Sequence, residues 1–239
     1  MRPTYLKILY LCILTIWCAI IPHDANAQRD RHSRGGSYNL CSDEEPKVRV
    51  KLATSKTRYY KNYSARTINQ IHNAPSGGTI LGLAGGPLVI ETRGQFSIRS
   101  QDNKACVQLK DVEVLFWAKP VVVIASNFKK GTCEYREVFA HEQKHIRTTR
   151  KFIREFAPKL RKEVKEIIKT SRLKIVTRSD NIDDAQAELG DPILARIKQF
   201  ENSIMPILRS RQMAIDTPEE YARVNAQCDN WGEALARGG

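Results

Sequence analysis

The chain of 239 residues is 41% hydrophobic and 27% charged, and 39 Lys and Arg against 26 Asp and Glu give it a formal net charge of +13. Its length allows one large domain or two small ones and is ample for a sizeable core. Beyond residue 27 the sequence contains neither the ~18 consecutive apolar residues of a membrane-spanning helix nor a basic stripe interleaved with aromatic residues, so it indicates no nucleic-acid partner.

The first 27 residues have the pattern of a signal peptide. Arg2 and Lys7 give a positive start, residues 8–21 form an apolar run, and residues 25–27 (Ala-Asn-Ala) form a small-x-small cleavage site. We therefore predict that Gln28 begins the mature chain. The protein is expected to be exported to the periplasm or the medium of a bacterium, with no stable membrane anchor after cleavage. An uncleaved anchor is the alternative.

Residues 28–40 are basic and poor in large apolar side chains, which is typical of a disordered leader. Loss of the signal peptide removes two basic residues and one acidic residue, so the mature chain carries a net charge of +12. An exported protein with this charge is expected to meet anionic envelope polymers or acidic substrates, or to use the charge only for solubility.

Residues 41–132 favour β-strands. Runs of alternating or β-branched apolar residues lie at 48–52, 79–84, 88–90, 96–98, 107–109, 112–114 and 120–125. Gly85-Gly86-Pro87 indicates a turn, and 59–71 is ambiguous, with a helix capped by Ser64 as one interpretation. We predict a small, mainly antiparallel β region. Its segment 121–125 is either an edge strand that could pair with an extended peptide or an ordinary core strand.

Residues 133–239 favour helices. A seven-residue apolar repeat predicts a first helix from near Glu134 to Ser171, with a kink at Pro158. The repeating residues are Phe139, Ile146, Ile153, Leu160 and Ile167. A second helix is expected from Asp191-Pro192 and a third after the capping box that begins at Thr217. The predicted fold class is α+β, a single domain over 41–239 that is β-rich over 41–132 and has long antiparallel helices over 133–239.

The first helix contains the motif H-E-x-x-H at residues 141–145. His141 and His145 lie one turn apart on the same helical face, where two imidazoles can bind one Zn²⁺. Glu142 lies beside them and can act as the general base toward a water that the metal activates. The alternative is an ordinary helix with two surface histidines.

Catalytic zinc requires a third protein ligand. The sequence contains no His after His145, so this ligand is a carboxylate, a Tyr or a distant His. If the later helices run back antiparallel to the first, the residues opposite the motif lie near 209–219. We predict Glu220 as the ligand, although it is also the partner of Thr217 in the capping box. The alternatives are Asp216, Glu219, Tyr221 and His72. Tyr221 can also polarise a carbonyl or hold an oxyanion, if it is not simply a core residue.

Four cysteines follow the predicted signal peptide, namely Cys41, Cys106, Cys133 and Cys228. Four thiols in an exported chain indicate two disulfides with three possible connectivities. The antiparallel arrangement of the helices would bring Cys133 near Cys228, which leaves Cys41 with Cys106.

A group of strands followed by an H-E-x-x-H helix resembles the zincin superfamily of metallopeptidases. More closely, the chain resembles exported bacterial zinc-dependent proteases in its signal peptide, in Cys133 ahead of the motif, and in the segment from Asp216 to Cys228. The resemblance implies that His141 and His145 bind zinc and that Glu142 is the base. The third-His extension of the metzincins is absent. The separate helix that carries the third ligand of thermolysin-like enzymes is also not evident, because Glu163 and Glu166 continue the first helix.

Together these features predict a hydrolase, specifically an exported zinc metalloprotease that acts on a peptide or protein substrate, with the cell envelope as one source of that substrate. One alternative is a non-catalytic envelope protein with a structural metal or a polymer-binding basic surface. Another is an amidase that cleaves peptidoglycan peptides.

Overall fold

The computed structural model describes residues 40–72 and 79–237. The predicted signal peptide and nearly all of the predicted leader lie outside these residues. Along the chain the elements are β1 (Lys47–Thr54), β2 (Arg58–Tyr60), α1 (Ala65–His72), β3 (Gly82–Gly85), β4 (Leu88–Gln101), β5 (Lys104–Ala118), β6 (Val121–Ile124), α2 (Cys133–Thr170), β7 (Lys174–Arg178), α3 (Ile182–Met213), α4 (Pro218–Asn225) and α5 (Trp231–Ala236). Strands fill the first half of the described chain and helices most of the second, as predicted.

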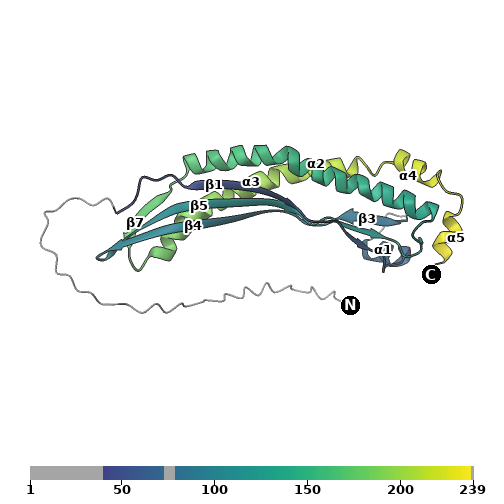
Figure 1. Ribbon diagram of the computed structural model, residues 1–239, viewed down its shortest axis with the longest axis horizontal. Helices are drawn as coiled ribbons and strands as arrows, with labels where there is room; N and C mark the ends of the chain where they lie inside the picture. The colour runs from purple at the N-terminus through teal and green to yellow at the C-terminus, as the bar shows by residue number, and fades with distance from the viewer. Residues whose placement is uncertain (1–39, 73–78, 238–239) are drawn as a thin grey trace, which may run out of the picture. The chain divides into compact units, whose positions relative to one another are not determined.

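The larger sheet has the order β1-β5-β4, and β7 pairs with the part of β5 that lies beyond the start of β1 (Figure 1). β4 and β7 are antiparallel to β5, but β1 is parallel to it, with Val48 opposite Val112. The prediction of a mainly antiparallel region is therefore only partly confirmed. Alternation along a strand shows which side chains face the core, but it carries no information on the direction of the partner strand.

The smaller sheet has the order β2-β6-β3, with β2 parallel and β3 antiparallel to the central strand β6. The segment 121–125 is therefore not an edge strand, because both sides of β6 are paired. The helix predicted after Ser64 is present as α1, and the Ser64 hydroxyl caps it by accepting a hydrogen bond from the Thr67 amide at 3.2 Å.

The first predicted helix is confirmed as α2. Thr132 caps its start by accepting a hydrogen bond from the Tyr135 amide, and the helix continues through Pro158 to Thr170. Glu163 and Glu166 therefore lie on the same unbroken helix as the motif, far along it, as predicted.

The later helices differ from the prediction in their boundaries. α3 begins at Ile182, about nine residues before Asp191-Pro192, because Ala185 and Leu189 are buried against Val107 and Ile175 of the sheet. The strand β7 that precedes it was not predicted. The third predicted helix is divided into α4 and α5, separated by residues 226–230.

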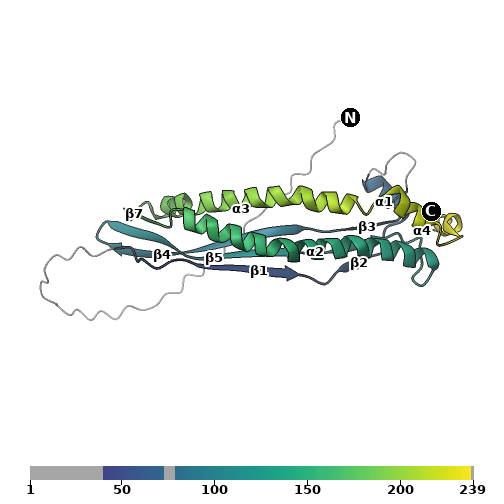
Figure 2. The same ribbon diagram turned by 90° about the horizontal axis from the view of Figure 1, so that it is seen from above.

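Helices α2 and α3 lie side by side on one face of the larger sheet (Figures 1 and 2). The main core forms between them and the sheet, and it includes Phe116 of β5, Phe152 and Leu160 of α2, and Ile197 of α3. The first third of α2 packs instead on the smaller sheet, with Val138 and Ile146 against Val122 and Ile124. One helix thus crosses both sheets, and the motif lies at the end over the smaller one.

Two disulfides join Cys41 to Cys106 and Cys133 to Cys228, which confirms both predicted pairings. The second ties the start of α2 to the segment after α4. Within the described residues, every helix is either too short or too polar to cross a membrane.

Candidate metal centre

The histidines of the motif lie on the side of α2 that faces the segment after α3. Both are buried, with 7% of His141 and 8% of His145 exposed, and their ring centroids are 5.1 Å apart. Burial of two neighbouring imidazoles requires partners for four ring nitrogens. The alternative of two ordinary surface histidines is therefore wrong.

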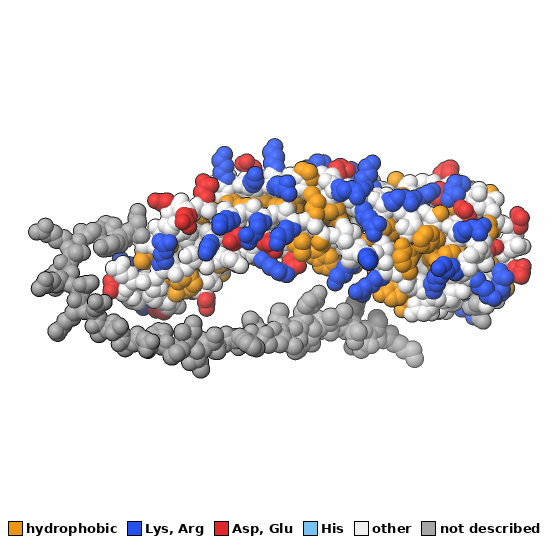
Figure 3. Space-filling model, viewed as in Figure 1, with side chains coloured by type: hydrophobic (Ala, Val, Ile, Leu, Met, Phe, Trp, Pro, Cys, Tyr) orange, Lys and Arg blue, Asp and Glu red, His pale blue; other side chains and the backbone are white. Residues whose placement is uncertain are grey.

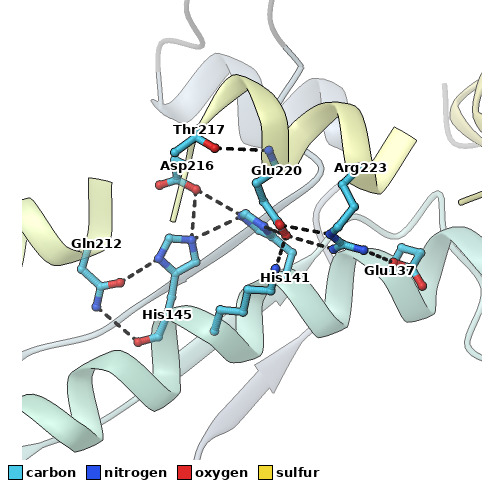
Figure 4. Close-up of polar contacts among 9 residues, drawn as sticks. Glu137, His141, His145, Gln212, Asp216, Thr217, Glu220 and Arg223 are labelled. Atoms are coloured by element: carbon cyan, nitrogen blue, oxygen red, sulfur yellow. Dashed lines mark hydrogen bonds and ion pairs between the residues drawn. The ribbon is translucent and has the colours of Figure 1, made fainter. Parts of the chain in front are cut away.

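Asp216 completes the cluster from the turn between α3 and α4 (Figure 4). Its Oδ1 lies 3.1 Å from Nε2 of His141 and 3.1 Å from Nε2 of His145, and the two Nε2 atoms are 3.3 Å apart. Among the described residues, these three form the group of metal-ligating side chains that converges on one point.

The distances in this triangle match the requirements of zinc. Ligands bound to Zn²⁺ at about 2.0–2.1 Å and at tetrahedral angles lie about 3.3 Å from one another. The three measured separations, 3.1, 3.1 and 3.3 Å, are close to that value. Two imidazoles and one carboxylate are also a set of ligands found in catalytic zinc sites, where the fourth coordination position of the metal stays open.

The Nδ1 atom of each histidine is held by a separate acceptor, so both Nε2 atoms are free to act as ligands. Glu220 Oε1 lies 3.2 Å from Nδ1 of His141, and Gln212 Oε1 lies 2.7 Å from Nδ1 of His145. The Gln212 amide is oriented by its own donors, since its Nε2 donates to the His145 carbonyl and to the Thr149 hydroxyl. A neutral imidazole that donates from Nδ1 to these acceptors has its lone pair on Nε2. In that tautomer of both rings, three electron-pair donors face one another.

Glu220, the predicted third ligand, contacts Nδ1 of His141 and not the Nε2 atoms that face Asp216. Its carboxylate accepts hydrogen bonds from Arg223 and Lys144 as well as from His141. Arg223 foremost, then Lys144 and His141, hold the pKa of Glu220 well below its ordinary value. A carboxylate that stays ionised and contacts Nδ1 fixes the orientation of the ring and raises its basicity as a ligand. The geometry thus favours Asp216, which the sequence left open as a second choice, over Glu220 as the third ligand.

The carboxylate of Glu142 lies against strand β3. It is 4% exposed, and burial, followed by the charge of Asp216, raises its pKa to about 8. β3 approaches so closely that a Cβ atom on Gly82 would lie 2.7 Å from Glu142 Oε1 and 2.7 Å from Val138 Cγ1. The glycine therefore provides the space that the carboxylate occupies.

Tyr221 lies over the other side of the centre, with its ring centroid 5.8 Å from that of His141. It is 49% exposed, so the interpretation of Tyr221 as a core residue is wrong. Burial of its hydroxyl side, and then the charge of Asp216, raise its pKa to about 12, so the hydroxyl remains a hydrogen-bond donor. Glu219 and His72, also considered as third ligands, are both exposed and belong to no converging group of ligands among the described residues.

An open pocket adjoins the centre on the α4 side. Its lining consists of Lys144, Ala214, Ile215, Thr217, Glu219, Glu220 and Arg223. Three residues at the centre were not predicted from the sequence, namely Gln212, Gly82 and Arg223. Gln212 lies within residues 209–219, which the antiparallel arrangement of the helices places opposite the motif. It also comes four residues before Asp216, about one helical turn. These two positions could have identified Gln212 from the sequence.

Comparison of the chain with protein-family models, with curated proteins and with solved structures finds no match. The chemistry of this centre is therefore inferred from its own geometry.

Proposed function

We propose that the protein is an exported zinc-dependent hydrolase that cleaves peptide bonds, with His141, His145 and Asp216 as the metal ligands. The observation that carries this proposal is the convergence of three electron-pair donors at tetrahedral-edge spacing while both Nδ1 atoms are bound elsewhere. Two Nε2 lone pairs and one carboxylate oxygen at this spacing form an electron-rich group that a divalent cation would neutralise. The proposal assigns to Asp216 the role predicted for Glu220.

The number of ligands supports a catalytic centre over a structural one. Structural zinc sites have four protein ligands, whereas catalytic sites have three and an open position. The converging group in the described chain supplies three. Asp216 is also the exposed member of the group, with 38% of its side chain accessible, so a substrate could approach the centre from this side.

When bound, zinc supplies a Lewis acid that polarises the scissile carbonyl and acidifies a water molecule. Glu142 takes a proton from the attacking water and passes it to the leaving amine. Its buried position next to Gly82 holds the carboxylate in one place and keeps bulk water from competing for that proton. Tyr221 donates a hydrogen bond to the oxygen that becomes negative during the attack.

The two disulfides support the proposal that the protein is exported. Two disulfides are typical of proteins that fold in an oxidising compartment. The predicted signal peptide would deliver the chain there, where peptides of the cell envelope are available as substrates.

The test uses Glu142→Gln and Asp216→Asn, with Glu219→Gln as a matched control at an exposed carboxylate of the same segment. Zinc content is measured by elemental analysis, and hydrolysis is measured on unfolded proteins and on peptidoglycan stem peptides. Glu142→Gln is expected to retain zinc and lose hydrolysis by at least about 10²-fold. Asp216→Asn is expected to lose zinc, and Glu219→Gln to change neither.

Two results would contradict the proposal. Hydrolysis that survives Glu142→Gln would exclude the general base, and purified protein that never takes up zinc would exclude the centre. Cleavage of stem peptides alone would instead identify a peptidoglycan amidase, which uses the same chemistry on a narrower substrate.

A further inference from the structure

The solvent-facing side of α2 is a continuous row of basic residues. Starting beside the metal centre and stepping by three or four residues, it consists of Lys144, Arg147, Lys151, Arg154, Lys162, Lys165 and Lys169, with Pro158 in its middle; we call this row the α2 stripe. Residues at this spacing lie on one helical face. At about 1.5 Å per residue the stripe is about 38 Å long. Lys and Arg side chains accordingly gather along the edge of the molecule where α2 lies (Figures 1 and 3).

The charges of the stripe are not neutralised by the fold. Only Lys144 makes an ion pair, with Glu220, while the other six make none with any described residue. Glu155 pairs with Arg211 and Lys159, and Glu166 stands beside the stripe without an ion pair in the described chain. Like charges three and four residues apart weaken a helix. The row therefore has an electrostatic cost that the described structure offsets only in part, at Lys144 and Lys151.

The basic composition of the whole chain does not explain the stripe. From Lys144 to Lys169, α2 carries ten Lys and Arg against three Glu. α3 packs on the same sheet, yet it carries four basic and five acidic residues over its whole length. The positive charge is thus concentrated on one of two otherwise similar helices.

We propose that the α2 stripe is a docking ridge for a linear polymer that carries phosphate groups along its backbone. Such a polymer complements the charge of the stripe. Five of the seven residues are Lys, which binds phosphate as a point charge and adapts to spacing, and release of counterions from the polymer drives such binding. This binding does not require the hydrolase function, since the α2 stripe contains none of the proposed metal ligands.

Other occupants fit the stripe less well. A helix that lies in a membrane surface presents large apolar side chains beside its basic ones. The exposed large apolar residues of the described chain include none from α2. Single-stranded nucleic acid is usually held by aromatic side chains that stack on the bases, and the stripe contains none. A polymer without bases, bound through phosphate alone, is the best match.

The test compares three mature, full-length proteins: the wild type, a stripe variant and a control variant. The stripe variant carries Arg154→Gln, Lys162→Gln and Lys165→Gln. The control carries Lys104→Gln, Lys129→Gln and Lys130→Gln, which remove the same charge at exposed positions outside α2 that make no ion pair with described residues. Binding to long-chain inorganic polyphosphate and to poly(glycerol phosphate) is measured at several salt concentrations.

We expect the stripe variant to bind both polymers about tenfold more weakly or worse than wild type. The slope of log affinity against log salt should fall in magnitude by about two to three, and the control should stay near wild type. Equal losses in both variants would overturn the proposal, because net charge alone would then explain binding. No binding by wild type at low salt, or stronger binding to phosphatidylglycerol vesicles than to either polymer, would also overturn it. Loss of hydrolysis in Glu142→Gln with binding intact would separate this proposal from that of the zinc hydrolase.

Discussion

The two ends of α2 bury different kinds of residue. From Phe152 to Ile168 the buried positions are all apolar and pack on the larger sheet and α3. From Glu134 to Ile146 four of the six buried positions are polar or titratable, and two of these are the histidines of the candidate metal centre. Apolar burial contributes most to stability, while buried polar groups are costly unless each finds a partner. One end of the helix therefore provides the stable scaffold, and the other end carries a site that this scaffold holds in place.

The sharpest way to test this division is to damage the scaffold end. Phe116→Ala removes a fully buried ring under α2 and should lower the free energy of unfolding by about 3–5 kcal/mol. The protein that remains folded should bind zinc as the wild type does, because Phe116 contributes to the core cluster under the other half of α2. Guanidinium denaturation and zinc titration below the transition measure the two effects. Weakened zinc affinity in the folded fraction would show that the two ends are not independent.

The two disulfides provide a matched pair for the second test. Replacing Cys133 and Cys228 by Ser should cost about 2–4 kcal/mol in stability and should also weaken zinc binding, since the bond anchors the segment after α4 to the start of α2. Replacing Cys41 and Cys106 should cost a similar amount of stability and leave zinc affinity unchanged. If both pairs of substitutions weakened zinc binding equally, the loss would reflect general loosening and not the position of Asp216.

The smallest of these effects is expected from Glu220→Ala. This change removes the acceptor on His141 Nδ1 but no proposed ligand, so zinc should bind about 10–100-fold more weakly without being lost. Glu219→Ala, one residue earlier and exposed, should leave the affinity near that of the wild type. Complete loss of zinc in Glu220→Ala, with retention in Asp216→Asn, would restore Glu220 as the third ligand.

Long-period patterns in the sequence predicted the fold most accurately. The seven-residue repeat located α2 to within a residue or two, and the antiparallel arrangement of helices yielded the Cys133–Cys228 pairing. The choice between Asp216 and Glu220 could not be made in this way, because they lie about one turn apart within the same window. That choice depends on two features of the folded chain. α3 ends at Met213, which leaves Asp216 in the turn that follows. Hydrogen bonds from Arg223 and Lys144 hold the Glu220 carboxylate away from the proposed metal position. These are tertiary contacts that local propensity does not encode.

The wide separation of the ligands along the chain has a consequence for the order of events in biosynthesis. His145 and Asp216 are joined only after α2, β7 and α3 have been made and folded back, and the Cys133–Cys228 bond spans 95 residues. The proposed centre can therefore assemble only after most of the chain has folded, and formation of the disulfide would then tighten it. A protein with this order of ligands would acquire its metal as a late step, once the scaffold that supports the ligands is in place.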